Sequence, residues 1–489
     1  MANQNLPSIQ TSDPEAHEIN PTNPSSTTSF FKAKDAVKKL KNNLVCRSKW
    51  AELNGAMGDL GTYIPIVLAL TLARDLNLGT TLIFNGVYNI ITGIIFGVPM
   101  PVQPMKSIAA EALSDKEFGV PEIMAAGILT GGVLFILGIT GLMKRVYKWI
   151  PLPVVRGIQL AQGLSFALTA VKYVKEVQDL PKSKALGERP WFGLDGLVLA
   201  IFCACFILIL NGAGEQNPGC CDTIKNSDNL DGERNNESGG NNWINKLRKF
   251  VFSLPSTFLV FMLGIILVFI RKNEVVQGIK FGPSSIQVVK FTKQSWKKGF
   301  CKGTIPQLQL SILNSVMAVC KLSTDLFPEK EFSVTSISVT VGLMNLIGCW
   351  FGAVPTCHGA GGLAGQYKFG GRSGGCVALL GVTKLVLGIV LGTSLTEFLK
   401  QFPVGILGVL LLFAGIELAL CARDLNSKED FFVALICTAI SLVGSSASLG
   451  FVIGLKVYML FKLRNYTKDK KLESSTSIFE STTSKFEES

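Results

Sequence analysis

Twelve apolar runs, each long enough or nearly long enough to cross a lipid bilayer, follow one another along this 489-residue chain. A membrane-spanning helix needs about 20 consecutive apolar residues. The pattern therefore predicts an all-α membrane protein that crosses the bilayer many times. The runs lie at about 53–73, 80–98, 121–142, 152–172, 192–211, 250–271, 304–322, 333–354, 374–396, 402–421, 430–446 and 448–463.

The composition excludes several other classes of protein. Only 17% of the residues are charged, compared with roughly 25% in an ordinary soluble domain. This excludes a soluble enzyme, a disordered protein and a receptor with a single anchor, and a β-barrel would show alternation with a period of two instead of continuous apolar runs. The net charge is +12, but the basic residues lie in the loops between the runs. We therefore interpret this charge as a signal of membrane topology and expect no nucleic-acid partner.

Polar stretches divide the chain into parts. We expect a disordered cytosolic tail at 1–49, a first transmembrane repeat at 50–271 with a polar loop at 212–249, a polar connecting loop at 272–303, a second transmembrane repeat at 304–463 and a cytosolic tail at 464–489. The lysine-rich segment before the first run places the N-terminus in the cytosol, because cytosolic flanks collect Lys and Arg. The connecting loop is also rich in lysine and disagrees with this orientation, which we keep because the first helices usually dominate it.

An internal repeat relates the two halves of the chain. Three identities recur at one constant offset: Gly86, Asn89 and Pro99 in the first half match Gly342, Asn345 and Pro355 in the second. With two short broken segments added to the twelve runs, each half has seven elements, about fourteen in all. An odd number of elements makes the second half insert upside down, which is the inverted-repeat plan of secondary transporters.

The two broken segments, 101–113 and 356–367, are the best candidates for a binding site. Proline and glycine prevent a regular helix through their first residues, so each is expected to be extended backbone followed by a half-helix. Irregular backbone at membrane depth must be buried in protein or line a cavity. Two half-helix N-termini that meet at mid-membrane expose free N–H groups and partial positive charge, which together make an anion site.

Polar side chains at these half-helices point to a small oxyanion as the ligand. Lys106 lies in the first turn of its half-helix, where a cation is unfavourable for the helix itself. Either an anion binds beside it, or Lys106 reaches water or pairs with Glu111. Gln103, Ser107 and Thr356 have groups that donate hydrogen bonds to oxygen atoms.

Other polar residues carry weaker expectations. Asn54 and Asp59 lie on the first apolar run, and Gln309 lies on its repeat mate. Asp59 is expected either to carry a coupling proton or to balance Lys106. His358 is a ligand donor, a proton-coupling group or a packed ring with one hydrogen bond.

Nothing in the sequence indicates an enzyme. There is no phosphate-binding loop of the type G-x-x-x-x-G-K-[ST], no nucleophile–base pair and no metal-ligand cluster. The segment from Gly359 to Ala364 matches a dinucleotide-binding pattern but lacks the surrounding parallel sheet, so its glycines are interpreted as positions of close helix approach. We expect no catalytic residue, cofactor or bound metal.

Three motifs resemble the plant-type molybdate transporter family, a branch of the sulfate permease superfamily. They are N-G-A-M-G-D-L-G-T-Y-I-P at 54–65, P-V-Q-P-M-K-S-I-A-A at 101–110 and P-T-C-H-G-A-G-G-L-A-G-Q-Y-K-F-G-G-R at 355–372. The resemblance implies fourteen elements, with a core domain of elements 1–4 and 8–11, a gate domain of elements 5–7 and 12–14, and an elevator-type movement. It also implies that the soluble regulatory domain of many sulfate permeases is absent. The site residues that it implies are Gln103, Lys106, Ser107, Thr356, Cys357 and His358.

The sequence therefore predicts a secondary active transporter of molybdate, embedded in the lipid bilayer. Alternatives with the same fold are a transporter of sulfate, a dicarboxylate or a nucleobase, and an anion channel. The complete set of predicted substrate-binding residues is Gln103, Lys106, Ser107, Thr356, Cys357, His358, Gly359, Asn54, Asp59 and Gln309. A coupling proton and a homodimer are further hypotheses. The plasma membrane is favoured over the vacuolar membrane, with both termini in the cytosol.

Overall fold

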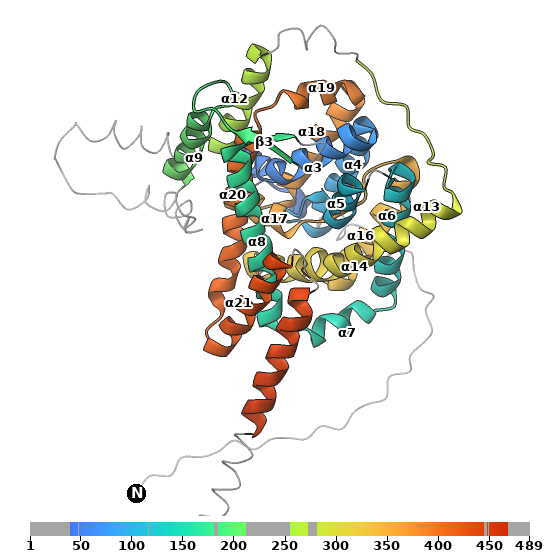
Figure 1. The fold of residues 1–489 in the computed structure, drawn as a ribbon, viewed down its shortest axis with the longest axis vertical. Helices are drawn as coiled ribbons and strands as arrows, with labels where there is room; N and C mark the ends of the chain where they lie inside the picture. Colours follow the sequence, from blue (N-terminus) through green and yellow to red (C-terminus); the bar gives the residue numbers. More distant parts are fainter. Residues whose placement is uncertain are drawn as a thin grey trace, which may run out of the picture.

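The computed structural model describes residues 40–46, 48–115, 117–179, 184–211, 255–271, 281–444, 447 and 449–467. Most of the described chain is helical (Figure 1). Its short strands form two pairs, β1 (Val102–Pro104) with β4 (Thr356–His358) and β2 (Glu176–Asp179) with β3 (Lys184–Glu188). Most of both predicted tails and the whole predicted loop at 212–249 lie outside the described residues.

The first half of the chain supplies its elements in the expected order. The leading helix is continuous through α2, η1 and α3 and reaches Arg74, where Asp75 leaves it with a left-handed backbone. The elements are α2 (Lys49–Ala56), η1 (Met57–Asp59), α3 (Leu60–Arg74), α4 (Leu78–Phe96), β1 (Val102–Pro104), α5 (Lys106–Ser114), α6 (Val120–Ile139), α7 (Leu142–Trp149), α8 (Leu152–Lys175), β2 (Glu176–Asp179), β3 (Lys184–Glu188), α9 (Leu197–Asn211) and α12 (Ser256–Arg271).

The second half begins with a long helix that contains two π-helical stretches, η5 and η6. This helix starts at Lys293, inside the predicted connecting loop, where the side chain of Thr292 accepts a hydrogen bond from the Ser295 N–H. The elements are α13 (Lys293–Lys298), η5 (Gly299–Thr304), α14 (Ile305–Leu310), η6 (Ser311–Ala318), α15 (Val319–Leu326), α16 (Val334–Gly348), η7 (Cys349–Phe351), β4 (Thr356–His358), α17 (Ala360–Lys368), α18 (Gly374–Val390), η8 (Gly392–Ser394), α19 (Leu395–Lys400), α20 (Val404–Leu420), η9 (Cys421–Asp424), α21 (Lys428–Val443) and a last helix at 449–467.

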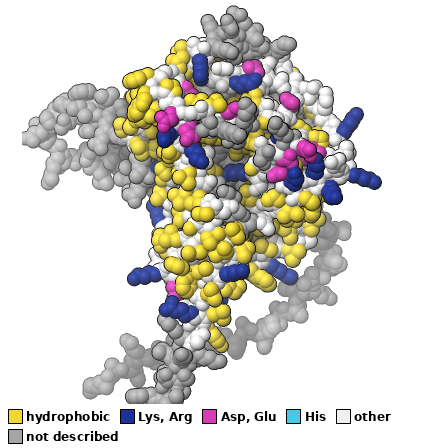
Figure 2. All heavy atoms as spheres, in the orientation of Figure 1, with side chains coloured by type: hydrophobic (Ala, Val, Ile, Leu, Met, Phe, Trp, Pro, Cys, Tyr) yellow, Lys and Arg dark blue, Asp and Glu magenta, His cyan; other side chains and the backbone are white. Residues whose placement is uncertain are grey.

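The helices confirm the predicted all-α membrane class. Within the described residues, six helices are long and apolar enough to cross a membrane, or seven if the bent pair α18–α19 counts as one span. Large apolar side chains such as Ile136, Phe202 and Ile209 are exposed on the outside of the bundle, and apolar atoms cover much of the face seen in Figure 2. A lipid-facing surface accounts for them. The count of fourteen elements stays a prediction.

Long helices of the first half pack against helices of the second half. Gly86 of α4 faces Gly381 of α18 so closely that a Cβ on either glycine would come within 2.7 Å of the other's carbonyl oxygen. Gly163 of α8 and Gly415 of α20 meet in the same way. Such close contacts hold helices together where no hydrophobic effect drives them together in lipid. They also join the two halves into one body.

The two broken segments meet, as predicted. Strands β1 and β4 form an antiparallel pair with Val102 opposite His358, Gln103 opposite Cys357 and Pro104 opposite Thr356. Each strand leads directly into a nine-residue half-helix, α5 after β1 and α17 after β4. The N-termini of α5 and α17 are therefore brought together from distant parts of the sequence.

Candidate anion-binding site

Each strand is held in place by one asparagine from its own half of the chain. The side-chain oxygen of Asn89 on α4 accepts a hydrogen bond of 2.8 Å from the Val102 N–H. The side chain of Asn345 on α16 bonds both backbone groups of Thr356, at 2.8 Å to N and 2.6 Å to O. Extended backbone inside a membrane needs such partners, because no water is present to replace them. These are the asparagines that match in the internal repeat, so the repeat locates the supports of the site.

Strand alternation separates the predicted residues into two groups. Directly opposite residues of an antiparallel pair share one face, and neighbours along a strand point to opposite faces. Gln103 and Cys357 therefore lie on one face of the β1–β4 pair, whereas Thr356 and His358 lie on the other. His358 packs its ring edge-to-face with Phe96, and its Nε2 lies 3.0 Å from the Thr340 hydroxyl.

On the face of the strand pair that carries Thr356 and His358, two polar atoms still have hydrogen-bonding capacity. Within the described chain, the Thr356 hydroxyl and the His358 Nδ1 are buried and make no hydrogen bond. The structure thus fits His358 as a packed ring with one hydrogen bond, one of the three roles considered from the sequence. Its assignment to the substrate site stays a prediction.

Lys106 lies at the start of α5 and faces α8. Its Nζ is 3.8 Å from the ring centroid of Phe166 on α8. Phe166 also lies over the start of α17, where a Cβ on Gly361 would be 2.0 Å from the ring. One aromatic side chain therefore covers both half-helix ends, a role that no sequence motif indicated.

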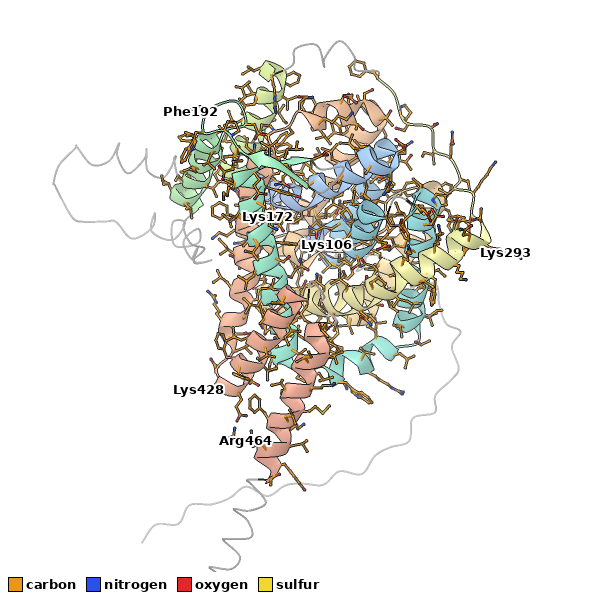
Figure 3. The ribbon with its side chains drawn as sticks, viewed as in Figure 1. Lys106, Lys172, Phe192, Lys293, Lys428 and Arg464 are labelled. Carbon is orange, nitrogen blue, oxygen red and sulfur yellow. The ribbon has the colours of Figure 1, made fainter. Side chains whose placement is uncertain are left out.

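A cavity leads from the surface to Lys106. It has a volume of about 340 Å³, and α3, α5, α8 and β2 supply its walls. Lys172 lies near the end of α8 (Figure 3), and its side chain lines the cavity together with Lys106 and Asp179. The cavity has the volume and the positive charge to admit a small anion as far as Lys106 at the start of α5.

The face of β1 that carries Gln103 meets a buried polar network. The Asp59 carboxylate is fully buried, and its Oδ1 accepts a hydrogen bond of 2.5 Å from the Gln103 Nε2. The same Nε2 lies 2.5 Å from the hydroxyl of Thr62. The other carboxylate oxygen of Asp59 is 3.4 Å from the Nζ of Lys384 on α18. Asp59 thus pairs with Lys384, a residue outside the predicted site.

The remaining predicted residues have varied surroundings. The backbone N–H of Ser107 donates a hydrogen bond of 2.9 Å to the side chain of Gln307 on α14. Gln309 is exposed. Residues two apart on a helix point in nearly opposite directions, so Gln307 rather than Gln309 reaches α5. Gly359 is required because a Cβ there would lie 1.8 Å from the Gln103 Oε1.

Asn54 supports the fold around the site. Its Nδ2 donates a hydrogen bond of 2.8 Å to the Phe369 carbonyl after α17. Its Oδ1 accepts hydrogen bonds from the first N–H groups of α12, those of Thr257 and Phe258, at 2.7 and 3.1 Å. Asn54 therefore ties α2, the end of α17 and the start of α12 together.

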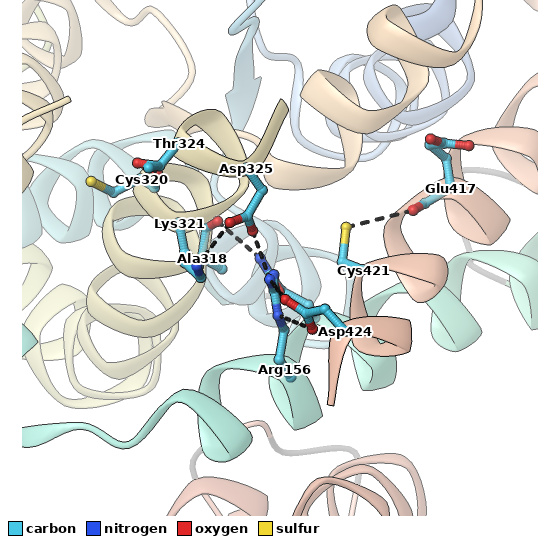
Figure 4. Close-up of polar contacts among 10 residues, drawn as sticks. Arg156, Ala318, Cys320, Lys321, Thr324, Asp325, Glu417, Cys421 and Asp424 are labelled. Atoms are coloured by element: carbon cyan, nitrogen blue, oxygen red, sulfur yellow. Dashed lines mark hydrogen bonds and ion pairs between the residues drawn. The ribbon is translucent and has the colours of Figure 1, made fainter. Parts of the chain in front are cut away.

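The end of α8 remote from Lys172 is closed by ion pairs (Figure 4). The buried guanidinium of Arg156 contacts Asp325 of α15 at 2.7 Å and is paired with Asp424 of η9. At a rise of 1.5 Å per residue, Arg156 lies about 24 Å along the helix from Lys172. In the described structure the cavity opens at the Lys172 end of α8, whereas ion pairs hold the Arg156 end to the second half of the chain.

The loop after α5 is also tied to the second half. Lys302 of η5 contacts the Asp115 carboxylate at 2.6 Å, and Lys298 contacts that of Glu117 at 2.8 Å. The hydrogen bond from Lys302 lowers the pKa of Asp115 below its usual value. These contacts lie beyond the C-terminal end of α5, away from Lys106.

Comparisons with known proteins agree with this arrangement. A family model described as "Molybdate transporter of MFS superfamily" matches residues 51–166 and 299–418. Molybdate transporter 1 of Arabidopsis thaliana is 63% identical over 434 residues, which are 88% of this chain and 92% of that protein. Molybdate transporter 2 of the same plant is 53% identical, over 87% and 89% of the two chains. Molybdate transporter 1 of Chlamydomonas reinhardtii is 33% identical, over 83% and 90%.

A solved structure shares the fold. It is the murine Solute Carrier 26 family member A9 anion transporter in the inward-facing state, which matches with a TM-score of 0.53. The match covers 92% of this chain and 74% of that chain at 14% identity. At this identity the likeness shows the fold alone.

Proposed function

Because this chain belongs to the plant-type molybdate transporter family, we propose that it is a secondary active transporter that carries molybdate across a cellular membrane. The observation that carries the proposal is the meeting of α5 and α17 at the β1–β4 pair, with Lys106 beside them at the end of a cavity. An oxyanion bound there meets N–H groups from both halves of the protein.

The charges at this place match the substrate. Each helix N-terminus acts as roughly half a positive charge, and Lys106 adds a full charge in its protonated form. The sum is about two, which balances the two negative charges of molybdate. A monoanion or a neutral ligand would leave positive charge uncompensated inside the membrane, which is costly.

The movement that we propose is of the elevator type. The half-helices travel with the part formed by α2–α6 and α13–α18, which we call the carrier part. This part moves against the part formed by α8, α9, α12, α20 and α21, which we call the scaffold part. Two observations support it: the cavity at Lys172 lies between the two parts, and Arg156 of the scaffold part holds Asp325 of the carrier part at the other end. In the opposite state the Arg156–Asp325 pair opens and the cavity closes.

Other substrates with the same fold are distinguished by uptake measurements. Cells without molybdate uptake of their own, expressing this protein, should accumulate labelled molybdate. Excess unlabelled molybdate should compete, whereas sulfate, a dicarboxylate and a nucleobase should compete less. Stronger competition by sulfate would reassign the substrate. Currents far above those of a turnover-limited carrier would favour the alternative of an anion channel.

We also propose that the protein resides in the plasma membrane with both termini in the cytosol, takes up a proton with its substrate and forms a homodimer. A fluorescent tag with membrane markers tests the location against the vacuolar membrane. Protease protection of terminal tags tests the orientation. Cross-linking in intact membranes tests the dimer, and a pH series of uptake tests the proton.

A further inference from the structure

The orientation of the Gln103 amide is set by Asp59. An ionised carboxylate only accepts hydrogen bonds, so the amide must turn its NH₂ group toward Asp59, as the 2.5 Å contact requires. The amide oxygen then points the other way. It lies beside Gly359, the residue before the first turn of α17, where a Cβ would be 1.8 Å away.

This orientation suits an empty site and opposes an anion. A carbonyl oxygen near the positive end of α17 is favourable when no anion is present. The same oxygen beside an arriving oxyanion brings two negative partial charges together in a place with little water to screen them. An amide that turned its NH₂ group toward the anion would instead donate hydrogen bonds to it.

We propose that Asp59 binds a proton together with the anion, and that this proton reverses the amide of Gln103. This inference rests on the proposed function, because the anion is the transported oxyanion. The protonated Asp59 donates its O–H to the Gln103 side-chain oxygen. The NH₂ group of Gln103 then faces the start of α17 and the anion.

The neighbouring hydroxyl allows the reversal without further movement. In the present arrangement the Thr62 Oγ1 accepts from the Gln103 Nε2 at 2.5 Å and donates to the Asp59 backbone oxygen at 2.8 Å. A hydroxyl both donates and accepts, so it can donate to Gln103 when the amide oxygen faces it. The step forms one O–H bond on Asp59 with a proton taken up from the solution, and that proton returns to the solution after the anion leaves.

The charges around Asp59 make proton and anion binding cooperative. The Lys384 Nζ lies 3.4 Å from the carboxylate and 3.5 Å from the centroid of the Tyr63 ring. Lys106 at the start of α5 and the Cys376 thiol of α18 face the same region.

Within the described chain, the other surroundings of Asp59 add no charge beside its carboxylate. The neighbouring surfaces of α17 and α20 consist of glycine and apolar residues, namely Gly362, Gly365 and Leu411. The Glu52 carboxylate of α2 accepts a hydrogen bond from the Arg372 N–H.

The dianion brings two negative charges to the site and the proton adds a positive one, so each ligand offsets the charge of the other. The proton also presents NH₂ instead of oxygen to the anion. Each ligand therefore raises the affinity for the other, as linkage requires.

Calorimetric titration of the purified full-length protein with molybdate tests this. Titrations in two buffers with different ionisation enthalpies, over a series of pH values, give the number of protons taken up. Wild type should take up as much as one proton per molybdate, and its Kd should then rise by up to tenfold per pH unit. The Asp59→Asn variant should take up fewer protons per molybdate than wild type and show a shallower pH profile, because its amide accommodates Gln103 in either orientation. The Glu52→Gln variant, which removes another buried acid of the same span, should keep the proton uptake of wild type.

A second variant covers the case in which Asp59→Asn does not fold. Lys384→Met removes the cation that lies 3.4 Å from the Asp59 carboxylate, so the pH profile of molybdate affinity should shift relative to wild type. An unchanged profile in Lys384→Met, or undiminished proton uptake in Asp59→Asn, would overturn the inference while leaving molybdate transport intact. Absence of molybdate binding by wild type at every pH would overturn the proposed function and this inference with it.

Discussion

Replacing Lys106 by methionine removes one positive charge from the proposed site with little change in volume. Methionine keeps a flexible apolar chain and a sulfur atom that packs well on an aromatic ring, so the contact with Phe166 (3.8 Å from Nζ to the ring centroid) is retained in kind. The change therefore tests the charge of the side chain rather than its bulk.

The expected effect on binding is large. Two unit charges at 4 Å attract by about 4 kcal/mol at an effective dielectric constant of 20, and a dianion doubles the gross value. Desolvation of the lysine offsets part of it, and removal of one partner from a close charge pair typically costs 2–5 kcal/mol. We take about 3 kcal/mol, which corresponds to a Kd about 150-fold weaker.

Molybdate titration of purified protein measures this value, and uptake into cells with surface quantification of the protein checks it. Lys106→Arg keeps the charge and should lose less affinity than Lys106→Met. Lys298→Met removes a lysine that pairs with Glu117 outside the site and should bind like wild type. A correctly sorted Lys106→Met variant with a Kd within threefold of wild type would refute the role of this charge.

Three further substitutions separate the site from its supports. Gly359→Ala should lower molybdate uptake at least tenfold at normal protein levels, because its Cβ would displace the Gln103 amide. The control Gly132→Ala should transport normally, because the atom nearest to its Cβ is 3.9 Å away. Equal uptake by the two variants would contradict this prediction. Asn54→Ala should lower the melting temperature without changing the molybdate Kd, because Asn54 holds the start of α12, and a weakened Kd with unchanged melting would place it in the site instead. Gly381→Val should reduce the amount of folded protein recovered from membranes, because α4 leaves no room for a Cβ; recovery equal to that of Gly132→Ala would argue against the packing described.

The sequence is most informative where backbone chemistry leaves few choices. The prolines Pro99, Pro101 and Pro104 exclude a continuous helix there. The match of Asn89 with Asn345 in the internal repeat identifies a second broken segment in the other half of the chain. Together they predict two half-helices that meet, which the antiparallel pairing of β1 and β4 confirms. The aromatic cover by Phe166 carries no such signal, because phenylalanine in an apolar run is equally expected to face lipid.

Side-chain direction was the harder part to predict. The choice between Gln307 and Gln309 depends on helix rotation, which an almost wholly apolar sequence leaves undefined. The opposite faces of Cys357 and His358 follow from strand alternation only after β4 is known to be a strand. The partner of Asp59 lies 325 residues away on α18, and only the packing of α4 against α18 brings Lys384 to it.

Binding of the anion between the N-termini of α5 and α17 can be seen directly in a structure with molybdate. Crystals or frozen-hydrated particles of the full-length protein with molybdate locate it directly, because molybdenum scatters far more strongly than the light atoms around it and has an accessible absorption edge. We expect a single strong peak within hydrogen-bonding reach of the first N–H groups of α17 and of the Lys106 Nζ. A peak only beside Lys172 at the cavity entrance, with the half-helix ends in contact with protein alone, would contradict it.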